Sequence, residues 1–196
     1  MTATLTSVAY AKNPDHERFI QGFTGQCRGR YHLAYLVGVE ILSGPALRAE
    51  IERDLGQPRY LPDQMYPSRD LAVIFDRAVR AGLSAERLGE LVIPTYKRVN
   101  PHAFEGRSVA DAFEILERGW RTETTYGGIS PAHEVEPGRV RIFRVGQPTP
   151  CAFFVGVIHG LFKAFGVEGS AAETTCQWEG AQSCCFEARW EHPKTV

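Results

Sequence analysis

The residues of this chain best suited to bind a metal or to react are its five cysteines. The spacing of some of these cysteines predicts that their thiols lie close together in the fold. Side chains alternate along a β-strand, so Cys184 and Phe186 share one face of a predicted strand near the C-terminus. Cys185 points to the opposite face of that strand. Cys176 lies on the preceding predicted strand, close to the turn that joins the two. The alternation therefore predicts that Cys176 and Cys184 face the covered side of one hairpin.

Cys151 begins a nearly all-apolar segment, and its position at a helix N-terminus favours the thiolate form. If that helix packs on the hairpin, three thiolates meet, and they repel one another unless a cation neutralises them. Zn²⁺ does so in a tetrahedral shell of four ligands. Glu173, three residues before Cys176, is the nearest candidate for the fourth ligand, although its strand parity requires a bend. Buried cysteines that bind no metal are the alternative, because the chain contains no CxxC pair.

The elements that must position these residues follow from the hydrophobic periodicity. The apolar, partly β-branched segment 32–42 predicts a strand. Capping residues and apolar spacing predict helices over about 45–55, 68–82, 84–96 and from Ser108 through Leu116. Alternation then predicts a strand over 139–145, followed by the helix 151–165 and two short strands at 172–178 and 184–191. A helical N-terminal half packed on an antiparallel sheet with one long apolar helix is an α+β fold.

Composition narrows the class of protein. Lys and Arg total 22 against 23 Asp and Glu, and this balance argues against a nucleic-acid or anionic-membrane surface. The first residues lack the features of a signal peptide, and no apolar stretch reaches the ~20 residues of a membrane span, so we expect a cytoplasmic protein. An odd number of cysteines without an export signal favours thiols or metal ligands over disulfides. We predict a flexible leader over 1–15 and a single ligand-binding domain over 16–191.

The pattern Glu173-x-x-Cys176-x-x-x-Gly180-x-x-x-Cys184-x-Phe186, preceded by Pro150-Cys151 opening an apolar helix, resembles the 4-vinyl reductase domain. The resemblance is to the version found in sensor domains of aromatic-responsive transcriptional activators. It covers residues 138–191, and the resemblance implies a structural zinc ion bound by the cysteines and glutamate at the matching positions: Cys151, Glu173, Cys176 and Cys184. Distant members of the same superfamily are the haem–nitric-oxide-binding domains.

The resemblance also implies an apolar pocket between the helical half and the sheet. His102 and Trp120 match, loosely, a histidine and a tryptophan that bind a phenolic hydroxyl in aromatic-sensing relatives. The other candidate ligand-binding residues are Tyr96, Phe104, Tyr126, Phe154 and His159. Haem or another tetrapyrrole is the rival ligand, since His102 or His159 could bind iron. Against haem, the Tyr-x-Ser-x-Arg motif of the nitric-oxide-binding relatives is absent around Tyr126.

Three functions remain open on these grounds. The first is a zinc-stabilised sensor or carrier of a small hydrophobic or aromatic molecule, acting through a homodimer or a partner protein. The alternative is a tetrapyrrole-binding protein or an accessory to a 4-vinyl reductase type of biosynthetic step. An enzyme using His102 or Glu105 for acid–base catalysis is the least supported, because no nucleophile–base pair and no Gly-x-Gly-x-x-Gly motif is present. The chain is therefore more readily a binding protein than an enzyme.

Overall fold

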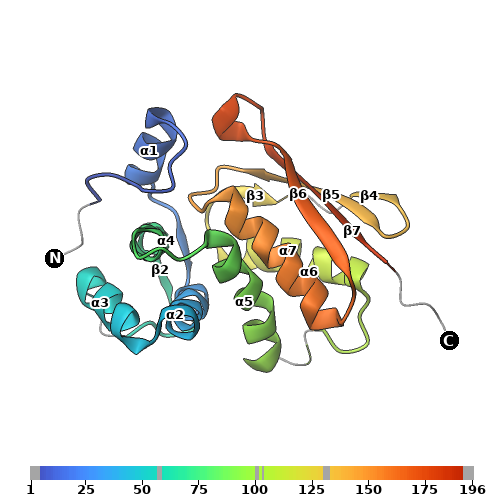
Figure 1. The fold of residues 1–196 in the computed structure, drawn as a ribbon, viewed down its shortest axis with the longest axis horizontal. Coiled ribbons are helices and arrows are strands. Elements are labelled where there is room, and N and C mark those ends of the chain that lie inside the picture. The colour runs from blue at the N-terminus through green and yellow to red at the C-terminus, as the bar shows by residue number, and fades with distance from the viewer. Residues whose placement is uncertain (1–4, 57–58, 100–101, 103, 130–132, 192–196) are drawn as a thin grey trace.

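The N-terminal part of the computed structural model is helical (Figure 1). The structure describes residues 5–56, 59–99, 102, 104–129 and 133–191. Short strands β1 (Gln26–Arg28) and β2 (Met65–Pro67) pair antiparallel beside these helices. The helices of this part are α1 (Pro14–Gln21), α2 (Gly29–Ser43), α3 (Pro45–Leu55) and α4 (Arg69–Arg80).

The predicted strand over 32–42 is wrong, because these residues belong to α2. Its buried side chains are His32, Tyr35, Leu36 and Val39, which are spaced i, i+3, i+4 and i+7. This is the period of a helix face rather than of a strand, and the β-branched residues of the segment outweighed it in the prediction. Helix α3 begins at Pro45 and ends at Gly56, whose φ of 64° is left-handed, as its sequence predicts.

Helices α5 (Ala85–Val99) and α7 (Cys151–Phe165) cross in direct backbone contact. A Cβ added to Gly156 would lie 1.9 Å from the Glu86 carbonyl oxygen, and one added to Gly89 would lie 2.0 Å from the Phe153 carbonyl oxygen. Glycine at these positions is therefore what allows the close crossing. Helix α5 contains Pro94 and continues to Val99, three residues beyond its predicted end at Tyr96.

Helix α6 (Val109–Glu123) begins with the predicted capping box. The Ser108 hydroxyl accepts a hydrogen bond from the Asp111 backbone, and the Asp111 carboxylate accepts one from the Ser108 backbone. The buried residues of α6 include Phe113 and Trp120, which face the interior of the molecule. No helix of the described residues is long and apolar enough to cross a membrane.

The C-terminal part is an antiparallel sheet with α7 against one face (Figure 1). Its strand order is β3-β5-β7-β6, with β4 also pairing with β5. The strands are β3 (Gly128–Ile129), β4 (His133–Glu136), β5 (Arg139–Val145), β6 (Gly169–Thr175) and β7 (Cys184–Trp190). With the helical half before it, this sheet confirms the predicted α+β fold.

The covered face of the sheet is formed by alternate residues of the central strands. Val140 and Ile142 of β5 lie opposite Ala188 and Phe186 of β7, and all four side chains are buried. The next pair on this face is Arg144 opposite Cys184. Strand alternation thus places one buried arginine beside a thiol at the end of the sheet nearest the N-terminus of α7.

Candidate metal centre

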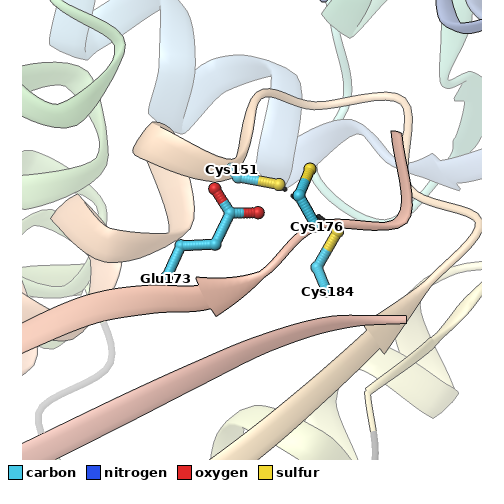
Figure 2. A group of neighbouring side chains, drawn as sticks. All are labelled: Cys151, Glu173, Cys176 and Cys184. Atoms are coloured by element: carbon cyan, nitrogen blue, oxygen red, sulfur yellow. Dashed lines mark hydrogen bonds between the residues drawn. The ribbon is translucent and has the colours of Figure 1, made fainter. Parts of the chain in front are cut away.

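The structure brings together the four side chains that the sequence singled out as metal ligands (Figure 2). One ligand atom from each of Cys151, Glu173, Cys176 and Cys184 lies within 4.8 Å of all the others. In a tetrahedral zinc site, Zn–S bonds of ~2.3 Å place the ligand atoms about 3.8 Å apart. The four side chains therefore need only small shifts to surround one ion.

Each ligand comes from a different local structure. Cys151 is the first residue of α7, and Cys184 is the first residue of β7. Cys176 follows the end of β6 and precedes the short 3₁₀ helix η2 (Gln177–Glu179). The register of β6 against β7 shifts between Glu173 and Thr175. This irregularity is the bend that the parity of Glu173 requires, because it turns the carboxylate to the same side as the thiols.

The thiols are buried and lie close to one another. The Sγ atoms of Cys151 and Cys184 are 3.4 Å apart, and all five cysteines of the chain are free thiols. The hydrogen bond from Cys151, followed by the Gln177 backbone N–H at 3.3 Å, lowers the pKa of Cys184 to about 6 despite its burial. The pKa of Cys151 is raised by the same hydrogen bond and by burial. Cys184 is therefore the thiol that ionises first.

One carboxylate oxygen of the cluster lacks a hydrogen-bond partner in the part of the chain that the structure describes. Oε1 of Glu173 is buried and has no hydrogen-bond partner among the described residues. Its Oε2 lies 3.4 Å from the Lys12 ammonium, which also lies 3.2 Å from Cys176 Sγ and 2.9 Å from Glu179. Because an unpaired buried carboxylate oxygen is costly, Oε1 is suited to bind a cation among the thiols.

The adjacent residue Cys185 takes no part in this cluster, as its strand parity predicts. It is also buried, but it lies opposite Phe143 on the other face of the sheet. Cys27 is not part of the cluster: it lies on β1, with its Sγ 3.8 Å from His32 Nδ1. Burial raises the pKa of Cys27 to about 12, so it stays a neutral thiol.

Lys12 and Arg144 are the residues near the centre that the sequence prediction missed. Lys12 precedes α1, so its contact with the hairpin depends on long-range packing that no local pattern shows. Arg144 was visible in principle, because it shares the strand parity of the buried Val140 and Ile142. An arginine at an inward position of an apolar strand is a signal of a buried anion nearby.

The two predicted pocket histidines are both accessible to solvent, and each is paired with a glutamate. His102 is on the surface with 84% of its side chain exposed, and its Nδ1 lies 2.9 Å from Glu105. The sequence predicted that His102 lines an internal pocket, whereas the structure places it on the surface. His159 is a quarter exposed, with its Nδ1 3.1 Å from Glu86 of α5.

The aromatic candidates are described by their contacts. Trp120 donates from Nε1 to the Tyr126 carbonyl at 3.2 Å and packs edge-on against the Tyr126 ring. Tyr96 and Phe104 pack together beside the end of α7, with ring centres 6.0 Å apart. Phe154 lies under the Arg144 guanidinium at 4.5 Å. Two pairs of the predicted pocket residues are therefore in contact, Trp120 with Tyr126 and Tyr96 with Phe104.

A surface depression lies beside Tyr126, with a volume of about 460 Å³. It is lined by Phe19, Gly22, Phe23, Thr24, Gly25, Thr125 and Tyr126. Gly25 is required there, because a Cβ on it would lie 2.5 Å from the Tyr126 ring. The depression contains no histidine and no cysteine, so it is separate from the thiol cluster.

Comparison with known proteins adds the fold class. No protein-family model matches the chain, and no curated protein matches its sequence. Among solved structures, it is similar to an H-NOX protein from S. oneidensis in the Fe(II)NO state, with a TM-score of 0.69 and 13% identity over 84% of this chain and 99% of that one. An oxygen-binding H-NOX domain related to soluble guanylate cyclases gives a TM-score of 0.70 at 16% identity, over 86% and 97%. A structure from a study of H-NOX activation gives 0.70 at 18%, over 86% and 99%.

The chain thus has the fold of the H-NOX domains, a class of α+β domain in which helices precede a sheet with one packed helix. At these identities the likeness shows the fold alone. The assignment to the 4-vinyl reductase family is wrong: no family model matches, and the similar structures are H-NOX domains. The motif behind it covers little more than a quarter of the chain, and a few fixed residues in a hairpin are a weak guide to family.

Proposed function

We propose that this chain is a ligand-binding sensor domain of H-NOX fold whose sheet and α7 are joined by a structural Zn²⁺ ion. The observation that carries the metal is the convergence of four ligand atoms within 4.8 Å. The sensor role is supported by the fold, and output would pass through a second copy or a partner protein. The aromatic ligand expected from the sequence gains nothing from the comparisons, and His102, its first candidate contact, is exposed.

A zinc ion at this site would have a structural role. Four protein ligands fill a tetrahedral shell and leave no position for a substrate or a catalytic water. The ligands come from the start of α7, from the end of β6 and from the start of β7. Binding the ion would therefore tie the helix to the hairpin, and the free energy of metal binding would contribute to folding.

Elemental analysis of the purified protein tests the metal. We expect about one equivalent of zinc per chain in the wild type, and a large loss of zinc in Cys184→Ser. Cys185→Ser is the matched control, because this neighbouring thiol is equally buried on the opposite face of the sheet. A wild type without stoichiometric zinc, or equal loss in the two variants, would contradict the proposal.

Haem binding is the second candidate, because the similar structures include an Fe(II)NO complex and an oxygen complex of H-NOX domains. The fold comparison thus supports the tetrapyrrole alternative more than the aromatic ligand. The described histidines, however, do not fit an axial ligand of iron. His102 is exposed and paired with Glu105, and His159 is paired with Glu86 at the α5–α7 crossing.

The two remaining histidines with described side chains are packed in the interior. Both ring nitrogens of His32 have neighbours, with Nε2 3.2 Å from the Pro67 carbonyl and Nδ1 near Cys27. His16 accepts a hydrogen bond at Nδ1 from the Lys12 backbone and stacks on Trp178, with ring centres 4.2 Å apart, while its buried Nε2 has no partner among the described residues. The stacked indole covers one face of the His16 ring, so this side chain does not face an open haem cavity either.

An absorbance titration separates the two candidates. Haem added to the purified, zinc-loaded protein should give no saturable Soret band with the spectrum of histidine-ligated iron. A saturable band at about one equivalent would favour the haem function instead. If such a band appears, His102→Ala is the first variant to compare. A surface histidine is not expected to bind the iron, so this variant should keep the band.

A further inference from the structure

Arg144 is a buried cation for which the described residues supply no carboxylate partner. Its side chain is 2% exposed, and Nη2 donates to the Thr149 hydroxyl at 2.8 Å and to the Gln147 amide oxygen at 3.4 Å. The guanidinium lies over the Phe154 ring, and Nε has no partner among the described residues. A charge taken out of water is costly unless an opposite charge lies near it.

Arg144 and the thiol cluster lie on one side of the sheet. Arg144 is directly opposite Cys184 in the β5–β7 register, on the same covered face. A guanidinium at this register position carries its positive charge on the side of the sheet that bears the thiols.

Lys12 approaches the cluster from the other side. Its ammonium contacts Cys176 Sγ at 3.2 Å and Glu173 Oε2 at 3.4 Å, and its side chain is 35% exposed. It reaches Glu179 as well, a carboxylate that is 65% exposed and solvated. Lys12 thus holds two of the four candidate ligands, while Arg144 lies beside a third.

These two cations match the charge of the proposed centre. Three thiolates and one carboxylate carry −4, and a divalent ion leaves −2. Lys12 and Arg144 supply +2, which brings the sum to zero. A monovalent ion would leave an uncompensated negative charge in this partly buried site, so the arrangement favours a divalent, thiolate-binding cation.

We propose that Arg144 and Lys12 are positioning residues that supply the counter-charge of the four ligands around a divalent cation. This inference rests on the proposed metal centre and adds two residues that do not touch the ion. Partners outside the ligand shell orient ligands and tune their basicity, and their loss commonly weakens metal binding by 10–100-fold.

Zinc affinity, measured by competition with a chromophoric chelator, tests this inference. We expect Arg144→Met to weaken zinc binding by about 10–100-fold, and Arg144→Lys to restore much of it because the charge is kept. Arg141→Met is the matched control: it lies on the same strand with the opposite parity, is half exposed and pairs with Glu187. Its affinity should stay within about twofold of the wild type, because it faces away from the centre.

Lys12→Met is the second variant, because a partly exposed side chain tolerates substitution even if Arg144→Met fails to fold. It should weaken zinc binding several-fold, with a loss that shrinks at high salt. Saturating Co²⁺ should give the same thiolate charge-transfer spectrum in wild type and variants, since the ligand set is unchanged. Wild-type affinity in either folded Met variant would overturn the inference, whereas a wild type that binds no metal would instead overturn the proposed function.

Discussion

Removal of the metal ion should substantially lower the melting temperature of this protein. Cys151 and Cys184 are 8% and 5% exposed, so the empty site leaves ionisable groups in a buried position without their cation. Zinc that binds only the folded state at 1,000 times its dissociation constant stabilises by about 4 kcal/mol. For a chain of this length, each kcal/mol shifts the melting temperature by about 2–4 °C, so we expect a decrease of about 8–16 °C.

The assay is thermal unfolding followed by circular dichroism, with and without an excess of a strong chelator. Cys185→Ser should respond to the chelator as the wild type does, because its thiol lies outside the cluster. Cys184→Ser should start at a lower melting temperature and should not respond. Equal melting temperatures of the wild type before and after removal of its zinc would refute the claim that the ion contributes to folding.

Three further outcomes follow from residues outside the centre. Burial lowers the pKa of His32 to about 4, so the unfolded state binds a proton at a higher pH than the folded state does. The free energy of unfolding should therefore fall by about 3 kcal/mol as the pH decreases from 6.5 to 4. In a pH series of denaturant melts, His32→Gln should flatten this decrease. Gly156→Ala should destabilise by about 3 kcal/mol or more through a clash with α5, whereas Gly119→Ala on open α6 should stabilise by about 0.5–1 kcal/mol, both read from denaturant midpoints. Ser108→Ala removes the capping box of α6 and should cost about 1 kcal/mol in the same assay, and no loss would show that the cap is not formed in solution.

Local signals explain why parts of the fold were predictable from the sequence. Helix α7 has the predicted ends, because Pro150 and Gly166 flank an uninterrupted apolar segment. The capping box of Ser108 and Asp111 likewise identifies the start of α6. Helix α2 was misread, because it is apolar on several sides and its buried face is set by tertiary packing rather than by a clear polar stripe.

Strand parity made part of the candidate metal centre predictable from the sequence. Alternation selects Cys184 over Cys185, and the required bend at Glu173 is present as a shift in register. The sequence does not report exposure in a loop, and His102, predicted for the pocket, is 84% exposed. Lys12 lies 161 residues from Glu173 along the chain, and no periodic pattern reports such a contact.

The backbone contact between α5 and α7 has a mechanical consequence. Two helices that touch main chain to main chain at Gly89 and Gly156 cannot slide past each other without steric overlap, so they move as one stiff body. Cys151 lies at the first end of α7, and Phe165 lies about 21 Å away at its last. A displacement of Cys151 along the helix axis is therefore expected to move the far end of α7, and α5 with it.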